Sequence, residues 1–180
     1  MVHRCCDLDN RIEDRVAEAN LIALMRGQGL FLATAESLTG GMLGQEITAT
    51  AGSSDVYLGG VIAYQNAVKE QLLGVSASLI SNQGAVDAEV AAQMASGIRS
   101  KFARANGLVV EKVIGIATTG VAGPGDSEGK PAGTVFIGLS SIGGESVYAH
   151  EFEGDRRQIR EQSVTAALAA LREQLQLISG

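Results

Sequence analysis

The sequence is poor in aromatic residues and in basic charge. Phe, Tyr and Trp make up 4% of its 180 residues, with no Trp, and 20 Asp and Glu exceed 14 Lys and Arg, for a net charge of −6. Proteins that bind single-stranded nucleic acid use stacking aromatics, and those that bind a phosphate backbone use a basic surface. The composition therefore argues against a nucleic-acid partner, although backbone amides can still form a local anion site.

Cysteine is scarce as well, because the only two are the neighbours Cys5 and Cys6. A disulfide between sequence neighbours would be strained, and the chain has no other cysteine to pair with. His3 lies close by, but three ligands at a chain end lack the fourth that a structural metal site needs. We expect two free thiols and no metal site.

Long apolar runs are also missing. No run approaches the about 20 residues of a membrane helix, and the first 15 residues are charged where a secretory segment would be apolar. We therefore expect a cytoplasmic protein without a membrane partner. Hydrophobic residues make up 46% of the sequence, which with this length predicts one globular domain, over 14–180, behind a flexible tail at 1–13.

Helical and strand patterns alternate over the first two-thirds of the chain, and a hairpin and a helix follow. The predicted helices are 10–27, 40–50, 65–73, 76–81, 87–106 and 155–178, and the predicted strands are 30–35, 56–64, 112–120, 134–141 and 145–153. This order is typical of a three-layer α/β/α sandwich around a mixed, mostly parallel sheet.

The sequence offers no Ser-His-Asp triad, because neither His3 nor His150 lies beside a serine-containing turn. We interpret His150 as a structural strand residue. Lysine is an alternative base, since a lysine whose charged form is disfavoured by burial can activate a hydroxyl. Lys69, soon after Tyr64 at the end of a predicted strand, is the candidate.

Three segments with small and polar residues follow predicted strands. They are the turn 35-AESLTGG-41, Tyr64 with Lys69, and the loop 118-TTGVAGPG-125. The carboxyl ends of parallel strands meet at one edge of a sheet, where ligands gather, so we expect one crevice there. Taken singly, Ser37 or Thr39 is more often a helix cap and Lys69 a solvated residue. Their joint placement favours a functional site.

Six ordered motifs resemble the CinA C-terminal domain family, which occurs alone as a bacterial nicotinamide-nucleotide amidase. They are 34-TAESLTGG-41, 51-AGSSDVYLGGVIAYQNAVKEQLLGV-75, 83-QGAVDAEVA-91, 119-TGVAGPG-125, 130-KPAGTVFIGL-139 and 152-FEGDRRQIR-160. The resemblance implies hydrolysis of the carboxamide of nicotinamide mononucleotide (NMN) to nicotinate mononucleotide and ammonia, in pyridine-nucleotide recycling.

Carried over by position, the resemblance implies Ser37 as the nucleophile, with Lys69 and Tyr64 as its activating partners. Lys69 would act as base and then acid, and Tyr64 would relay or orient the proton. The oxyanion would bind to backbone amides of the turn 38–41 or the loop 119–124.

The resemblance, and the tendency of helix N-termini and arginine to bind anions, imply several groups that donate hydrogen bonds to the substrate phosphate. The predicted substrate-binding residues are Glu36, Thr39, Gly40, Gly41, Ser54, Asn66, Thr119, Gly120 and Arg156. The first turns after 37–41 and 51–54 would supply amides, and Arg156 would bind phosphate, although by itself it reads equally well as a surface residue. The family implies neither metal nor organic cofactor, and a homodimer or larger homo-oligomer.

The sequence departs from the family at a few positions. Leu38 stands where relatives often have Cys, and Gln65, Ala67 and Val68 differ between the tyrosine and the lysine, which affects fine specificity more than catalysis. Longer relatives carry an N-terminal nucleotide-processing domain, whose activities we do not expect here. The alternatives are a non-catalytic nucleotide-binding module of the same fold, and an amidase for a different small carboxamide.

Overall fold

The computed structural model describes residues 20–179, so the predictions for the tail 1–13, including His3, Cys5 and Cys6, lie outside the described residues. After a helix through 20–28 come β1 (Phe31–Glu36), α2 (Met42–Ala49), β2 (Tyr57–Ile62), α3 (Asn66–Leu73), α4 (Ala77–Gln83), α5 (Ala88–Ala105), β3 (Val113–Gly120), β4 (Thr134–Ser141), β5 (Gly144–Glu151) and α6 (Arg156–Ser179). Each strand and helix predicted within 20–179 is present, with ends shifted by a few residues. Strand β2 ends two residues before Tyr64.

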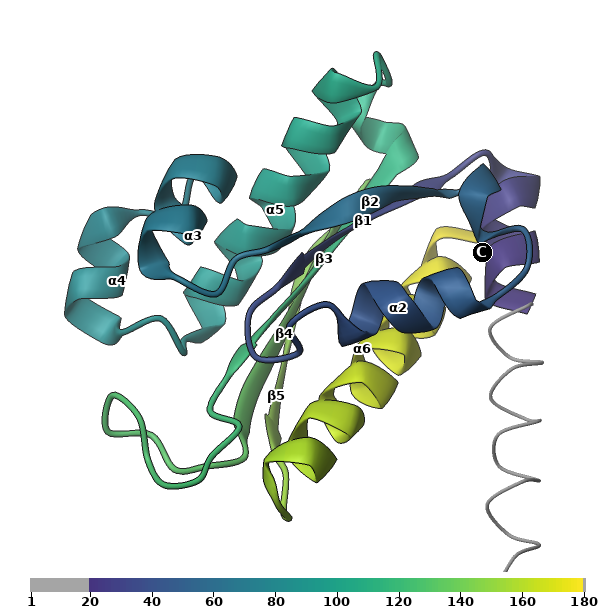
Figure 1. The fold of residues 1–180 in the computed structure, drawn as a ribbon. Helices are drawn as coiled ribbons and strands as arrows, with labels where there is room; N and C mark the ends of the chain where they lie inside the picture. Colours follow the sequence, from purple (N-terminus) through teal and green to yellow (C-terminus); the bar gives the residue numbers. More distant parts are fainter. Residues whose placement is uncertain (1–19, 180) are drawn as a thin grey trace, which may run out of the picture.

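The five strands form one sheet in the order β2-β1-β3-β4-β5 (Figure 1). Strand β1 pairs in parallel with β2 and β3, whereas β4 pairs antiparallel with both β3 and β5. Four strands therefore point the same way and β4 runs against them. This confirms the prediction of a mixed, mostly parallel sheet.

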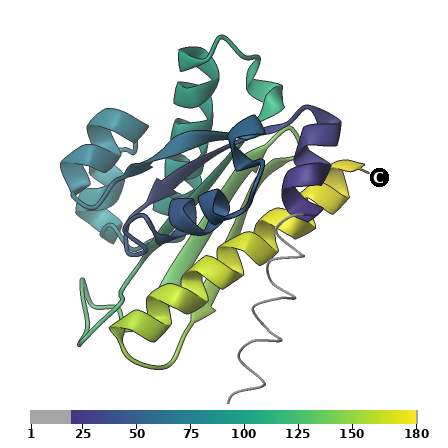
Figure 2. The same ribbon diagram turned by 45° about the vertical axis from the view of Figure 1, so that its right-hand side comes forward.

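Helices cover both faces of the sheet. Helices α3, α4 and α5 lie on one face, and α2, α6 and the helix at 20–28 on the other (Figures 1 and 2). Each face has its own apolar cluster: Leu32 packs with residues of α2 and α6, while the next residue along β1, Ala33, packs with residues of α5. This alternation is the period-two pattern of a strand that is covered on both sides.

The sheet brings three loops to one edge. Glu36, the last residue of β1, is in register with Ile62 of β2 and Thr118 of β3, so the segments that follow these strands leave together. The loop 121–133 and the first turn of α6 approach the same edge. Among the described helices none is long and apolar enough to cross a membrane.

Candidate active site

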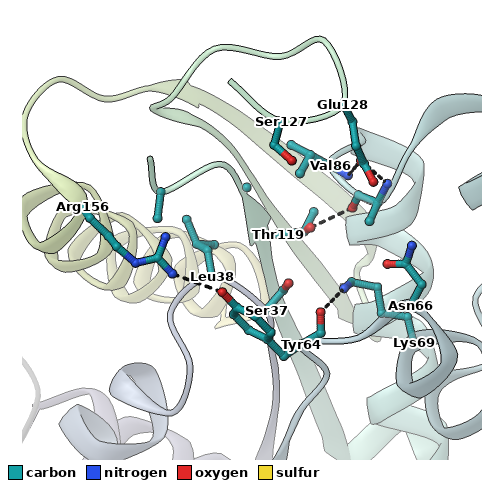
Figure 3. Close-up of a pocket in the computed structure, with 13 residues that line it drawn as sticks. Ser37, Leu38, Tyr64, Asn66, Lys69, Val86, Thr119, Ser127, Glu128 and Arg156 are labelled. Carbon is teal, nitrogen blue, oxygen red and sulfur yellow. Dashed lines mark hydrogen bonds between the residues drawn. The ribbon is translucent and has the colours of Figure 1, made fainter. Parts of the chain in front are cut away.

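A cavity of about 200 Å³ opens at this edge of the sheet (Figure 3). Seven residues predicted from the sequence line it: Ser37, Tyr64, Asn66, Lys69, Thr119, Gly120 and Arg156. The lining also contains six other residues: Leu38 and Ala122, which lie in the two segments predicted to bind the oxyanion, and Ala85, Val86, Ser127 and Glu128, to which sequence reasoning assigned no role. Five predicted residues, Glu36, Thr39, Gly40, Gly41 and Ser54, do not line it.

Ser37 is the first residue after β1, and its position is set by the sheet. Its backbone N–H donates to the carbonyl oxygen of Thr118 at 2.9 Å, which continues the β1–β3 pairing by one residue. The side chain is directed into the cavity (Figure 3), and the residue is 9% exposed. A hydroxyl group is thus presented to the cavity from a backbone that the sheet holds in place.

The turn behind Ser37 is organised by Glu36, which is 2% exposed. Its carboxylate accepts hydrogen bonds from the backbone N–H groups of Gly41 (2.8 Å), Leu43 (3.0 Å) and Gly44 (2.8 Å), and from the Thr39 hydroxyl (2.8 Å). The first turn of a helix leaves such N–H groups without partners, and a carboxylate satisfies them well. Glu36 therefore caps α2 and is not placed as a substrate ligand.

Two predictions about this turn need correction. At the N-terminus of α2 the Glu36 carboxylate already accepts from Gly41, and the N–H of Gly40 donates to the carbonyl of Ser37, so neither amide is free for a substrate phosphate. Thr39 is not the helix cap, because Gly41 is the N-cap residue and Thr39 bonds to Glu36 and Thr118 instead. All these side chains and amides fix the shape of the turn.

A residue of α6 holds the same turn from outside. The guanidinium group of Arg160 donates from Nε to the carbonyl of Leu38 at 2.9 Å and from Nη2 to the carbonyl of Thr39 at 2.7 Å. Sequence reasoning missed Arg160, although it stands within the motif 152–160, because nothing local links it to a turn more than a hundred residues away.

Lys69 reaches the cavity from the first half of α3 and is only 1% exposed. Its ammonium group donates to the backbone carbonyl of Tyr64 at 3.3 Å. Burial lowers the pKa of Lys69 below its ordinary value, because the charged form loses water, and the negative charge of Glu128 partly opposes this. A buried lysine with a lowered pKa inside a cavity is a candidate general base.

The Tyr64 side chain takes a different position from the one expected. Its ring is 55% exposed, and its hydroxyl accepts a hydrogen bond from Nη2 of Arg156 at 3.1 Å, while Nη1 of Arg156 donates to the carbonyl of Gly123 at 2.7 Å. Lys69 contacts the carbonyl of Tyr64 and not its hydroxyl. The expected proton relay through the Tyr64 hydroxyl finds no hydrogen bond here, and it stays a prediction.

The other predicted ligands have distinct surroundings. The Thr119 hydroxyl donates to the carbonyl of Ala85 at 2.8 Å, so it supports the cavity wall. Asn66 is exposed at the start of α3, on the lining. Gly120 has no room for a side chain, because an added Cβ would lie 2.7 Å from the carbonyl oxygen of Thr134.

Ser54 lies at the wrong edge of the sheet to reach the cavity. It belongs to a short turn of helix, Ser53–Asp55, that precedes β2, whereas the cavity lies beyond the ends of β1 and β3. The loop entering a parallel strand and the loop leaving it are on opposite edges of a sheet. Ser54 therefore does not line this cavity, and its role as a phosphate donor stays a prediction.

His150 and the acidic side chains of the described residues form no further site. His150 lies in β5, stacks on Phe152 with ring centroids 5.0 Å apart, and has a pKa lowered by burial, as suits a strand residue. Within residues 20–179 no three His, Cys, Asp or Glu side chains are grouped in a way that could hold a metal ion.

Fold and cavity together define an α/β protein with a serine and a buried lysine at the carboxyl edge of its parallel strands. The sequence model of the CinA C-terminal domain matches residues 14–175, and the chain belongs to this family. A CinA-like protein of Acaryochloris marina is 45% identical over 166 residues, which cover 91% of this chain and 38% of the relative. A CinA-like protein of Geobacter sulfurreducens is 42% identical over 168 residues, again 38% of its length. The chain thus spans less than half the length of these curated relatives.

Solved structures agree with the fold. A CinA superfamily protein from Klebsiella pneumoniae superposes with a TM-score of 0.79 at 31% identity, covering 89% of this chain and 96% of that one. A competence/damage inducible protein from Agrobacterium tumefaciens gives a TM-score of 0.79 at 31% identity, over 88% and 93% of the two chains.

Proposed function

We propose that this protein is an amidase that hydrolyses the carboxamide of NMN to nicotinate mononucleotide and ammonia. The observation that carries the proposal is the meeting of Ser37 with a fully buried lysine, Lys69, in one cavity. A module that only binds a nucleotide has no need to bury a lysine beside a serine hydroxyl, since burying the ammonium costs free energy. An enzyme has a reason to bury the lysine, because a serine hydroxyl is a weak nucleophile that needs a neutral base to take its proton.

The reaction follows from these two groups. Neutral Lys69 accepts the proton of the Ser37 hydroxyl as its oxygen attacks the carboxamide carbon. The resulting ammonium returns the proton to the departing nitrogen, which leaves as ammonia while the serine ester remains. Water, deprotonated by Lys69 in the same way, then attacks the ester carbon. The Lys69 ammonium returns this proton to the departing Ser37 oxygen, and nicotinate mononucleotide is released.

The oxyanion has two sets of backbone donors nearby. In the turn, the N–H groups of Gly40 and Met42 donate to the carbonyls of Ser37 and Thr39, and Gly41 donates to Glu36. We therefore assign the oxyanion to the N–H groups of Leu38 and Ala122, two residues that both line the cavity.

Among the predicted phosphate donors, Arg156 lines the cavity, whereas Gly40, Gly41 and Ser54 do not. A second cavity of about 180 Å³ adjoins the first and shares Tyr64, Ser127 and Arg156 with it, and its wall includes the backbone of 123–125. We place the nicotinamide ring in the first cavity and the ribose phosphate in the second. Arg156 is then the phosphate ligand, exchanging its present bonds to Tyr64 and Gly123 for the substrate.

The test is ammonia release from NMN by the purified protein. Ser37→Ala and Lys69→Met are each expected to lower kcat/KM by on the order of a thousand-fold or more, because each removes a group that acts on the reacting atoms. Lys112→Met is the matched control, since Lys112 is exposed and bonds to the carbonyl of Gln28. Circular dichroism checks that each variant is folded.

Each alternative gives a different result in this assay. Tight NMN binding without turnover would identify a non-catalytic nucleotide-binding module. Weak activity on NMN, with hydrolysis of another small carboxamide that still depends on Ser37 and Lys69, would identify a different amidase. A Ser37→Ala variant as active as the wild type would exclude Ser37 as the nucleophile.

A further inference from the structure

The loop 121–133 contains a small hairpin, 127–130, that reaches over the cavity (Figure 3). Ser127 and Lys130 exchange two backbone hydrogen bonds, of 3.0 and 2.9 Å, around Glu128 and Gly129. Both central residues have positive φ, 52° and 76°, and Glu128 is the one non-glycine residue with positive φ in the described chain. Glutamate rarely adopts this conformation, so side-chain contacts must offset its cost.

Those contacts tie Glu128 to the opposite wall of the cavity. Its carboxylate accepts hydrogen bonds from the backbone N–H groups of Ala85 (2.6 Å) and Val86 (3.4 Å). The carbonyl of Ala85 is in turn held by the Thr119 hydroxyl. At Gly84 an added Cβ would lie 2.4 Å from the same carboxylate, so the chain passes very close to it. The wall at 85–86 is thus fixed by two side chains from different segments.

Glu128 is also the acidic side chain that faces Lys69. Of the charged residues that line the cavity, Lys69 and Arg156 are basic and Glu128 is acidic. Acids on neighbouring elements are directed elsewhere: Glu36 caps α2, Glu89 bonds to Gln93 on the exposed side of α5, and Asp126 lines the adjoining cavity. Glu70 follows Lys69 on α3, whose burial pattern places it outside the lining.

We propose that Glu128 is a positioning residue of this site, which holds the wall at 85–86 and supplies the counter-charge to the Lys69 amine. The inference rests on the proposed role of Lys69 as the base. It adds the acidic residue Glu128, which lies in the part of the loop after Gly125, and the family resemblance gave that part no role.

The physical reason is that burial and the negative charge of Glu128 act on the basicity of Lys69 in opposite directions. Burial lowers its pKa, and the charge of Glu128 raises it again. Proton transfer from a serine hydroxyl, and back to a departing amine, works best when the pKa of the base lies near the working pH. A fixed carboxylate across the cavity moderates the effect of burial without blocking the amine by a direct ion pair.

The test follows the charge of Lys69 directly, by ¹³C NMR of the lysine ε-carbons over a pH series. The sequence has four lysines, and the Lys69 signal is the one lost in Lys69→Met. Glu128→Gln is expected to move the Lys69 midpoint to lower pH, because the carboxamide removes the negative charge yet can accept the same hydrogen bonds. Glu128→Asp, which retains the charge, is expected to stay closer to the wild type.

Lys130→Met is the matched control for the anchoring of the hairpin. The ammonium of Lys130 donates to the carbonyl of Gln83 at 2.9 Å. Lys130→Met removes this contact of the hairpin but retains the Glu128 side chain and its charge. No downward shift is expected for it. An unchanged midpoint in Glu128→Gln, or an equal downward shift in Lys130→Met, would overturn the proposal.

Activity gives the second measurement. If the protein hydrolyses NMN, the acidic limb of the pH profile of kcat/KM should move to lower pH in Glu128→Gln together with the NMR midpoint. If the protein does not hydrolyse NMN, the proposed function fails, but the titration of Lys69 still decides the role of Glu128. The two failures are therefore distinguishable.

Discussion

Glu36 and Lys69 are both buried charged side chains, and the protein treats them in opposite ways. The Glu36 carboxylate accepts hydrogen bonds from three backbone N–H groups and one hydroxyl, which satisfy it fully. The Lys69 amine donates one hydrogen bond, to the carbonyl of Tyr64 at 3.3 Å, and the Glu128 carboxylate lies across the cavity from it. Burial lowers the pKa of Lys69. The first arrangement builds structure, and the second leaves an amine ready to exchange a proton.

A prediction at the residue scale concerns the pH dependence of NMN hydrolysis. With the neutral amine of Lys69 as the proposed base, kcat/KM should rise with pH through an apparent pKa below the ordinary lysine value of 10.5. Protonation at lower pH removes the base and the activity. A profile measured from acidic to alkaline pH tests this, and a flat profile would contradict it. Lys69→Arg is the control, since arginine stays protonated and should be inactive throughout.

At the scale of single residues, sequence reasoning placed Ser37 and Lys69 at one cavity but missed the residues that hold its walls. Ser37 and Lys69 could be predicted because each follows a strand at the same edge of the sheet. Glu128 and Arg160 could not, because their partners lie 42 or more positions away along the chain. Such contacts depend on how loops pack, which no local pattern encodes.

At the scale of elements, α5 rests closely on the sheet because glycine faces it on neighbouring strands. An added Cβ at Gly115 of β3 would lie 2.1 Å from the carbonyl oxygen of Ala95, and one at Gly138 of β4 would lie 2.2 Å from that of Ala91. The two carbonyls are one helical turn apart. The backbone of α5 therefore lies almost directly on β3 and β4. Helix α3, which carries Lys69, lies on the same face of the sheet as α5.

This packing gives a prediction about stability. Gly138→Ala is expected to lower the free energy of unfolding by about 1–3 kcal/mol, because α5 must move away from β4. Gly27→Ala, in the helix at 20–28, has nothing within 4 Å of the added Cβ and is expected to leave stability unchanged or raise it by up to about 1 kcal/mol. Urea unfolding measures both, and equal stability of the two variants would contradict the close-packing account.

The elements themselves were largely predictable. The predicted hairpin is formed by β4 and β5, and the predicted helix 87–106 is present as α5, which Asp87 caps by accepting a hydrogen bond from the N–H of Glu89 at 2.8 Å. These features depend on residues close in the sequence. The end of β2 was placed two residues too late, because the apolar run continues through Ala63 after the strand has ended.

At the scale of the whole molecule, we propose that the chains associate, as the family resemblance implies. β2 is an edge strand, and Ile62, Tyr64 and Leu72, at its end and on the next helix, are large side chains that remain 45–56% exposed. Light scattering coupled to size-exclusion chromatography should give a mass of at least twice the 18.6 kDa of one chain. A mass of one chain at micromolar concentration would contradict the proposal.

The sequence alone determined the order and type of the elements and the edge of the sheet where the site lies. Hydrophobic periodicity and turn residues act over a few positions, and strand direction then brings Ser37, Lys69 and the loop 118–125 together. Only the tertiary structure decided which polar groups face the cavity. It made Glu36 the cap of α2, with Thr39 bonded to its carboxylate, and it left Ser54 at the far edge of the sheet. It also brought Glu128 across to face Lys69, because such contacts depend on packing between distant segments.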